Sequence, residues 1–286
     1  MRTLHEYVAT WPESGRLTMK MPVSATASEF AGKTVVITGA CGIYGTWIAE
    51  AFAKAGAHVC LTDRRDAPLE LTLREINASK DSHCIAADLS RDDDLEALAD
   101  QVAARWGAPD ILVNNAGIYP SGFLLDIRPA DWDRIMNVNL RAPFILSRSM
   151  ARLMIAEKRR GAIVNISSGA AGKMRRSVAP YCISKTALDR LTKGFALELA
   201  EYGIRVNAVE PGFVASSTSS TLTAEHVSRV LSSIPLGRPS VPEDLPAAIM
   251  FLCSQAASYV TGATLAVDGG NAIGSLDVYQ EKKHAL

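Results

Sequence analysis

Short segments that are apolar throughout alternate with longer amphipathic segments from Lys33 onward. The apolar segments predict seven strands, at Thr34–Thr38, His58–Thr62, His83–Ala87, Ile111–Val113, Ala162–Ser167, Arg205–Val209 and Thr264–Val267. Apolar residues at helical spacing between them predict helices from Gly45, through Leu69–Ile76, around Leu98, and over 131–157, 181–202 and 243–255. Strands without a polar face are typical of a sheet buried on both sides. The β-α-β-α order therefore predicts an α/β domain with a doubly wound parallel sheet of about seven strands.

Two end segments do not share this pattern. Residues 1–30 mix polar and apolar positions without periodicity, and residues 271–286 are polar. We interpret the first as an N-terminal extension and the second as a C-terminal tail, each packing on the body or on a neighbouring subunit. One domain over residues 31–270 remains between them.

Composition and charge narrow the classes of function. The 286 residues include 30 Lys+Arg and 30 Asp+Glu, so the formal net charge is zero. Nucleic acids and anionic membranes select a basic excess, and neither is expected as the main partner. No apolar run approaches a membrane span, and the first thirty residues lack the apolar core of a secretory signal. Five scattered cysteines and five histidines show no metal-ligand spacing, so we expect no metal and a reducing, cytoplasmic location.

A glycine-rich turn follows the first predicted strand and opens into a helix. Its glycines are Gly39, Gly42 and Gly45. Glycines at such a turn let backbone N–H groups approach a pyrophosphate, and the helix N-terminus adds partial positive charge. The turn therefore predicts a dinucleotide site.

Asp63 ends the second predicted strand, 24 residues after Gly39. A carboxylate there accepts hydrogen bonds from the adenosine ribose and repels a 2′-phosphate, which favours NAD over NADP. A helix-capping or turn Asp is the structural alternative. Arg64 and Arg65 follow directly, and arginine is the residue that binds a 2′-phosphate. We expect NAD, with NADP as the second choice.

Tyr181 and Lys185 form a YxxxK pattern that a helix places on one face. Tyr279 and Lys283 form a second copy, so the pattern alone is weak. Ser168 lies thirteen residues before Tyr181, at the end of a predicted strand, and Tyr279 has no such serine. The first copy is therefore the candidate catalytic pair.

Together these motifs resemble the short-chain dehydrogenase/reductase family, in its compact branch, over about residues 32–270. Further support comes from Asp88-Leu89, Asn114-Asn-Ala-Gly117, Asn139, Pro211-Gly212 and the run Tyr259–Gly270. One departure concerns the glycine spacing. Ile43 occupies the position where the compact branch usually has its middle glycine. The resulting glycine spacing resembles that of the family's extended branch, so the detailed contacts to the phosphates stay open.

The resemblance implies a Rossmann-type fold and a role for each motif. It implies that Tyr181 is the acid/base and that Ser168 holds the reacting oxygen. It implies that Lys185 holds the nicotinamide ribose and, together with the nicotinamide charge, lowers the pKa of the Tyr181 phenol. Asn139 is expected to anchor a water that relays protons to solvent. It places Asp88 near the adenine, Asn114 in the central sheet and Val214 near the nicotinamide amide. The remaining expected cofactor contacts are Gly39, Gly42, Ile43, Gly45, Asp63, Leu89, Asn115, Gly117, Pro211, Gly212 and Ser216. It also implies a homo-oligomer, a dimer or tetramer, built on helices 131–157 and 181–202 and on Tyr259–Gly270.

Two segments bear on the small-molecule substrate. Ala215–Thr223 is rich in Ser and Thr and suits a mobile lid, with a surface loop as the alternative. Lys173-Met-Arg-Arg176 lies between Ser168 and Tyr181 and resembles the stretch found in gluconate 5-dehydrogenase-like sugar-acid dehydrogenases, with Arg175 as the candidate substrate ligand; a solvated basic turn is the alternative.

We therefore expect an NAD-dependent secondary-alcohol dehydrogenase acting on a sugar acid or polyol. A 3-oxoacyl thioester reductase shares every motif, although Asp63 weighs against it because the family's biosynthetic reductases usually take NADPH. A non-catalytic NAD-binding sensor is the alternative of another class. It would be expected to have lost Ser168, Tyr181 or Lys185, and all three are present.

Overall fold

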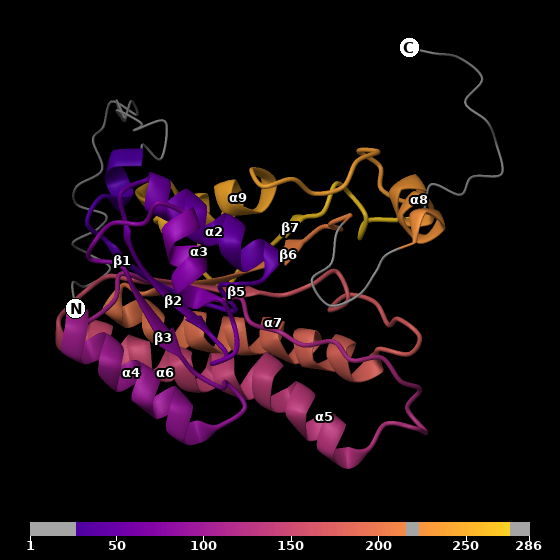
Figure 1. Ribbon diagram of the computed structural model, residues 1–286, viewed down its shortest axis with the longest axis horizontal. Coiled ribbons are helices and arrows are strands. Elements are labelled where there is room, and N and C mark those ends of the chain that lie inside the picture. The colour runs from indigo at the N-terminus through magenta and orange to yellow at the C-terminus, as the bar shows by residue number, and fades with distance from the viewer. Residues whose placement is uncertain (1–26, 216–222, 275–286) are drawn as a thin grey trace, which may run out of the picture.

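The computed structural model describes residues 27–215 and 223–274, and these fold as one parallel sheet between two layers of helices (Figure 1). The described strands are β1 (Thr34–Thr38), β2 (His58–Asp63), β3 (His83–Ala86), β4 (Ile111–Asn114), β5 (Ala162–Ile166), β6 (Arg205–Pro211) and β7 (Thr264–Val267). Their order across the sheet is β3-β2-β1-β4-β5-β6-β7. The predicted doubly wound α/β fold is thereby confirmed.

Helices connect these strands on both faces. The α-helices are α2 (Ile43–Lys54), α3 (Leu69–Glu75), α4 (Asp92–Trp106), α5 (Pro129–Met136), α6 (Ala142–Ala156), α7 (Ala179–Leu199), α8 (Ala224–Ser232) and α9 (Asp244–Cys253). Four short helices, η1 (Ala27–Phe30), η2 (Asn137–Arg141, a π-helix), η3 (Ala200–Tyr202) and η4 (Gln255–Ala257), complete the described part.

The side chains on the two faces of β1 belong to two separate hydrophobic clusters. Val35 and Ile37 pack with Phe52 of α2 and with α9 on one face, whereas Val36 packs with α4 and α6 on the other. Successive side chains of a strand point to opposite faces, so a strand between two helical layers must be apolar at every position. This explains why the central strands lack a polar alternation.

The strand order reverses next to β1, which pairs with β2 on one side and with β4 on the other. Chain connections leave the carboxyl ends of β1 and β4 in opposite directions at such a point and open a crevice between them. The topology therefore places the ligand site at the carboxyl ends of these two strands.

The edge strands differ from the central ones. Three of the four residues of β7 and two of the four residues of β3 are exposed. Full burial was expected for all seven strands, but an edge strand lacks a neighbour and part of its helical cover. The two edges are thus less buried than their composition predicts.

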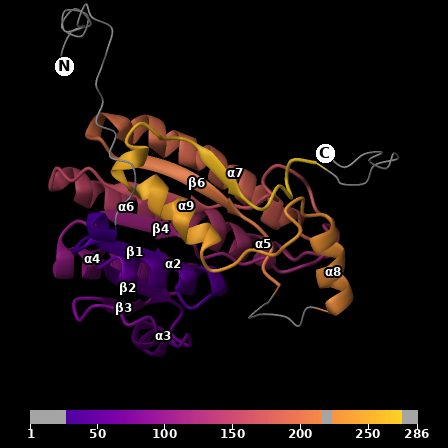
Figure 2. The same cartoon turned by 90° about the horizontal axis from the view of Figure 1, so that it is seen from above.

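The predicted long helix over 131–157 is divided. Residues 137–141 form a π-helix between α5 and α6, and Asn139 lies within it. Such wide turns occur mostly at functional sites. Helix α8, which the sequence did not predict, lies toward the same end of the molecule as α5 (Figure 2). Most of the expected lid, Ala215–Thr223, lies outside the described residues.

Two residues just before the predicted boundary at residue 31 contact the body. Phe30 is fully buried and meets Phe52 edge-to-face, with ring centroids 5.3 Å apart. Glu29 accepts a hydrogen bond from the Gln255 amide. The division at residue 31 stays a prediction, with these two residues already in contact with the body. Within the described residues, every helix is too short or too polar to cross a bilayer.

Candidate active site

A cavity of about 1110 Å³ lies at the carboxyl ends of the central strands. Its walls are the glycine turn, the segments after β2, β3 and β4, the stretch around Ser168, and the chain after β6. This is the crevice that the strand order requires. Of the predicted cofactor residues, Gly39, Gly42, Ile43, Gly45, Asp63, Asp88, Leu89, Asn115, Gly117, Pro211, Gly212 and Val214 line it.

The glycine turn is packed too closely for side chains at two of its three glycines. Gly39 has φ +63°, and a Cβ there would lie 2.8 Å from the Ala116 Cα. A Cβ on Gly45 would lie 2.1 Å from the Gly39 carbonyl oxygen. Gly42 has extended backbone and room for a Cβ, so packing within the protein does not require a glycine at this position. A cradle without side chains in front of a helix N-terminus fits a pyrophosphate.

Asp63 is held against this turn by its own hydrogen bonds. Its Oδ2 accepts from the Cys41 N–H at 3.0 Å, and its Oδ1 accepts from the Arg64 N–H at 2.8 Å. Each carboxylate oxygen keeps a second lone pair for a ligand hydroxyl. The carboxylate is therefore fixed at the cavity wall.

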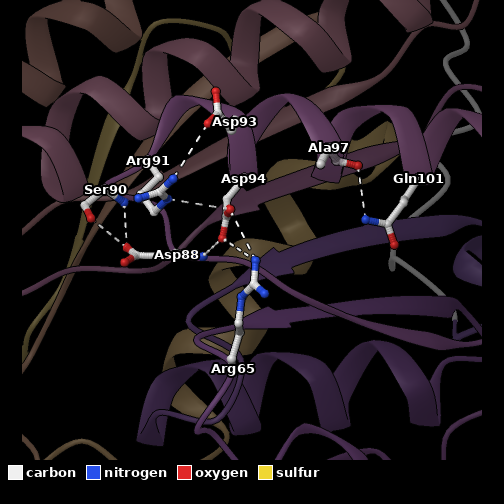
Figure 3. Close-up of polar contacts among 8 residues, drawn as sticks. All are labelled: Arg65, Asp88, Ser90, Arg91, Asp93, Asp94, Ala97 and Gln101. Atoms are coloured by element: carbon white, nitrogen blue, oxygen red, sulfur yellow. Dashed lines mark hydrogen bonds and ion pairs between the residues drawn. The ribbon is translucent and has the colours of Figure 1, made fainter.

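Two loops beside the cavity are joined by one carboxylate, that of Asp94 (Figure 3). Asp94 accepts from the Asp88 N–H at 2.8 Å and from the Arg65 guanidinium at 3.4 Å. Asp88 in turn accepts from the N–H and the hydroxyl of Ser90, which lowers the pKa of its carboxyl group. Arg65 thus points to Asp94, whereas Arg64 lines the cavity.

The end of β4 is fastened to the glycine turn through Asn115. Its side-chain amide donates to the carbonyls of Thr38 and Gly39, at 2.9 and 3.0 Å. Its own N–H donates to the Thr38 hydroxyl at 3.0 Å. Asn115 therefore sets the separation of two cavity walls.

Ser168, Tyr181 and Arg175 converge at one end of the cavity. Ser168 and Arg175 line it, and the Tyr181 phenol is hydrogen-bonded to the Ser168 side chain. The Tyr119 ring, also lining the cavity, meets the Tyr181 ring edge-to-face at 5.9 Å. Arg175 is close enough for its charge to act on the phenol. The Ser168 hydroxyl and the Arg175 guanidinium therefore line this end of the cavity, and the Tyr181 phenol is bonded to Ser168 without lining the cavity itself.

Lys185 and Asn139 support this end from behind the wall. Lys185 is 3% exposed, and its Nζ donates to the Ile166 carbonyl at 2.7 Å. Asn139 is buried and bonds both backbone groups of Ile118, accepting from its N–H at 2.8 Å and donating to its carbonyl at 2.8 Å. Lys185 Nζ lies 3.5 Å from where a Cβ on Gly117 would be, so the amino group is next to a lining residue.

Burial dominates the electrostatics of Tyr181 and Lys185. Burial raises the pKa of Tyr181 above its ordinary value, and the Ser168 hydrogen bond and the Arg175 charge lower it only in part. Burial also lowers the pKa of Lys185 to about 8, against the opposing charge of Asp189. In the protein without a cofactor, burial outweighs the charges that act on Tyr181, and the expected lowering of its pKa by Lys185 together with the nicotinamide charge stays a prediction.

Arg175 and Arg176 are placed differently. The Arg176 guanidinium lies 5.1 Å over the ring of Phe123, whereas Arg175 faces the cavity. Lys173, the third basic residue of this stretch, donates to the Asn271 carbonyl at 3.1 Å. One of the three positive charges is thus directed at the site.

A buried amide network lies beneath the site, and only its first member was predicted. The side-chain amide of Asn114 donates to the Asn165 Oδ1 at 2.8 Å, and the Asn165 Nδ2 donates to the Thr192 hydroxyl at 2.8 Å. These two hydrogen bonds link β4, β5 and α7. The isolated polar residues inside apolar runs were the signal for it, since buried polar groups require partners.

Two lining tyrosines, Tyr44 and Tyr119, were also absent from the predicted site, and no spacing rule marks them. Ser216 and the Tyr279…Lys283 copy lie outside the described residues.

Comparison with known proteins gives consistent matches over most of the chain. A family model described as enoyl-(acyl carrier protein) reductase matches residues 39–272. A Rickettsia typhi 3-oxoacyl-(acyl-carrier-protein) reductase FabG is 39% identical over 245 residues, covering 85% of this chain and 98% of that protein. A 2-dehydro-3-deoxy-D-gluconate 5-dehydrogenase of Escherichia coli K12 is 36% identical over 248 residues, covering 86% and 97%.

A solved structure of a gluconate 5-dehydrogenase from Burkholderia cenocepacia J2315, in complex with NADP and tartrate, is similar in fold and sequence. It superposes with a TM-score of 0.79 at 34% identity and covers 87% of this chain and 99% of that one. Since the family model and these relatives run through the whole cavity, from the glycine turn to the chain after β7, the chain belongs to the short-chain dehydrogenase/reductase family of oxidoreductases.

Proposed function

We propose that this oxidoreductase interconverts a secondary alcohol and a ketone with NAD, on a polyhydroxylated substrate such as a sugar acid or polyol. The observation that carries the proposal is the convergence of Ser168, Tyr181 and Arg175 at one end of the cavity. The relatives named as gluconate-type dehydrogenases support the substrate class.

The residues present fit a nicotinamide dinucleotide. The cradle at Gly39 and Gly45 excludes side chains, and Asp63 lies at the wall beyond it. When bound, the dinucleotide supplies or accepts the hydride. The fixed Asp63 carboxylate and the engagement of Arg65 by Asp94 support NAD. The Burkholderia relative holds NADP, which makes this preference the point to test.

The side chains divide the remaining work. Tyr181 removes the proton from the substrate hydroxyl during oxidation and returns it during reduction. Ser168 donates to the reacting oxygen and fixes its position beside the phenol. The amino group of Lys185, next to Gly117, holds the ribose hydroxyls. Asn139 keeps the backbone of Ile118 in place and anchors the water through which protons reach solvent.

Arg175 selects the substrate through its charge. A guanidinium that faces the cavity can bind a carboxylate in a charge-assisted pair. A 3-oxoacyl thioester reductase is the second candidate, supported by the Rickettsia relative at a similar level of identity. The placement of Arg175 favours the sugar acid, because a thioester offers no carboxylate at the reacting end.

We further propose that the chain forms a homo-oligomer in the cytoplasm. An apolar groove between η2, α6 and α7 supports the assembly, and five free cysteines fit a reducing compartment.

The test is the steady-state kcat/KM with NAD for sugar acids, for the matching neutral polyols and, in the reducing direction, for an acetoacetyl thioester. Arg175→Ala should cost about ten- to a hundredfold on the acid, because a charged hydrogen bond contributes about 1.5–3 kcal/mol. The neutral polyol should lose less, and its loss should shrink at high pH, since Arg175 also lowers the pKa of Tyr181.

Arg176→Ala is the matched control and should leave kcat/KM unchanged for both the acid and the neutral polyol. Tyr181→Phe should abolish turnover while NAD binding persists. Thioester reduction that is fastest and insensitive to Arg175 would instead establish the acyl reductase. Tight NAD binding without turnover on any of these substrates would establish the sensor.

A further inference from the structure

Tyr44 joins two opposite walls of the cavity. It is the second residue of α2, directly within the glycine turn, and its hydroxyl donates to the Gly212 carbonyl at 2.5 Å. The two residues are 168 positions apart in the sequence. The bond therefore connects the phosphate cradle to the chain that leaves β6.

Gly212 is fixed from its other side as well. A Cβ there would lie 2.9 Å from the Cα of Asp268, so the backbone of Gly212 is pressed against the chain after β7. The peptide plane that follows Gly212 also carries the N–H of Phe213 on its opposite edge. A hydrogen bond that orients the carbonyl thus orients the start of residues 213–214, which line the cavity.

The Tyr44 ring is itself held in place, and its hydroxyl stays a donor. The ring meets Trp47 edge-to-face at 5.6 Å. Burial, followed by the nearby phenols of Tyr181 and Tyr119, raises the pKa of Tyr44 well above its ordinary value. The hydroxyl therefore stays protonated and can donate to the Gly212 carbonyl.

We propose that Tyr44 is a positioning residue for the nicotinamide half of the dinucleotide: through the Gly212 carbonyl it sets the wall formed by residues 212–214. This rests on the proposed dinucleotide function. The glycine cradle serves the phosphates and Asp63 serves the adenosine ribose, so the contribution of Tyr44 is confined to the remaining half of the cofactor.

The test compares Tyr44→Phe with the wild-type protein by calorimetric titration of NADH and of ADP-ribose, which lacks the nicotinamide. The variant keeps the ring and loses one hydrogen bond, so the Kd for NADH should rise about three- to tenfold. The Kd for ADP-ribose should stay within about twofold, and its binding shows that the variant is folded. Tyr202→Phe, an exposed tyrosine outside the cavity, is the matched control.

An equal rise for both ligands, or no rise for NADH, would overturn the proposal. The pH profile of kcat gives a second readout. Its acid limb should keep its position in Tyr44→Phe, and a shifted limb would make Tyr44 part of the proton transfer instead. Failure of the wild-type protein to bind either ligand would contradict the dinucleotide function itself, so the two failures are distinguishable.

Discussion

The amino group of Lys185 is buried, and removal from water favours the neutral form of the amine although the group donates to a backbone carbonyl. Its pKa falls from 10.5 to about 8 for this reason. Between these two pH values the unfolded chain holds more protons at this site than the folded protein does. Stability contributed by this site therefore rises with pH across that window.

Lys185→Met removes this titration. Thermal unfolding without ligands, measured from pH 7.5 to 10.5, should show the wild-type protein gaining stability relative to the variant as the pH rises through about 8 and beyond. Lys193→Met on the same helix is the control, because that side chain is exposed and stays in water on folding. A constant difference between the wild-type protein and Lys185→Met would contradict the buried, neutralised amine.

Single residues were predictable where chemistry fixes their spacing. Tyr181 and Lys185 share a helix, and Ser168 follows a strand end, so a sequence pattern includes all three. Tyr44 and Gly212 meet across 168 positions. No local pattern encodes such a contact, since it depends on how β1 and β6 lie in the finished sheet.

At the scale of elements, the loop after β2 and the loop after β3 act as one unit, because Asp94 binds both (Figure 3). Asp94→Asn keeps an acceptor for the Asp88 N–H and removes the charge that engages Arg65. Without this ion pair, the Arg65 guanidinium is available to bind the 2′-phosphate of NADP. The ratio of kcat/KM for NAD over NADP should fall about two- to fivefold, because an ion pair with a solvent-exposed partner contributes little and its loss changes cofactor choice only modestly.

Asp93→Asn is the matched control for this change. Its carboxylate lies 3.7 Å from Arg91 and is exposed, so neutralising it tests the general loss of negative potential. If the NAD-over-NADP ratio of kcat/KM fell equally in both variants, Arg65 would have no specific role in the choice of cofactor.

The elements themselves followed from periodicity, with one instructive exception. The helical pattern over 131–157 is continuous in sequence, yet the backbone widens at Asn137–Arg141. Asn139 bonds Ile118 in a different segment. The spacing of hydrophobic residues indicates which face of a helix is buried. It does not reveal a widened turn that accompanies a polar contact with another segment.

For the whole molecule, the described surface carries an apolar groove formed by Met136, Leu140, Phe144, Ala187 and Leu191. It lies on the helices that the family resemblance assigned to subunit contacts. Phe144→Glu places a charge in this groove and should reduce the mass measured by light scattering at micromolar concentration to that of a smaller assembly.

Leu71→Glu is the control, since Leu71 is exposed on α3, in the opposite helical layer. A wild-type protein that is already monomeric would rule out the proposed assembly.

The strand order also bears on how the chain reaches this structure. Every pairing in the described sheet is parallel, and even β2 and β3 pair residues that are 23 positions apart, as in Cys60 with His83. No hairpin exists to form first, so each pairing must wait for a loop of this length or more to close. Folding is therefore expected to be slow for a protein of this size, and β3 and β7, exposed before assembly, are the strands through which incompletely folded chains would join one another.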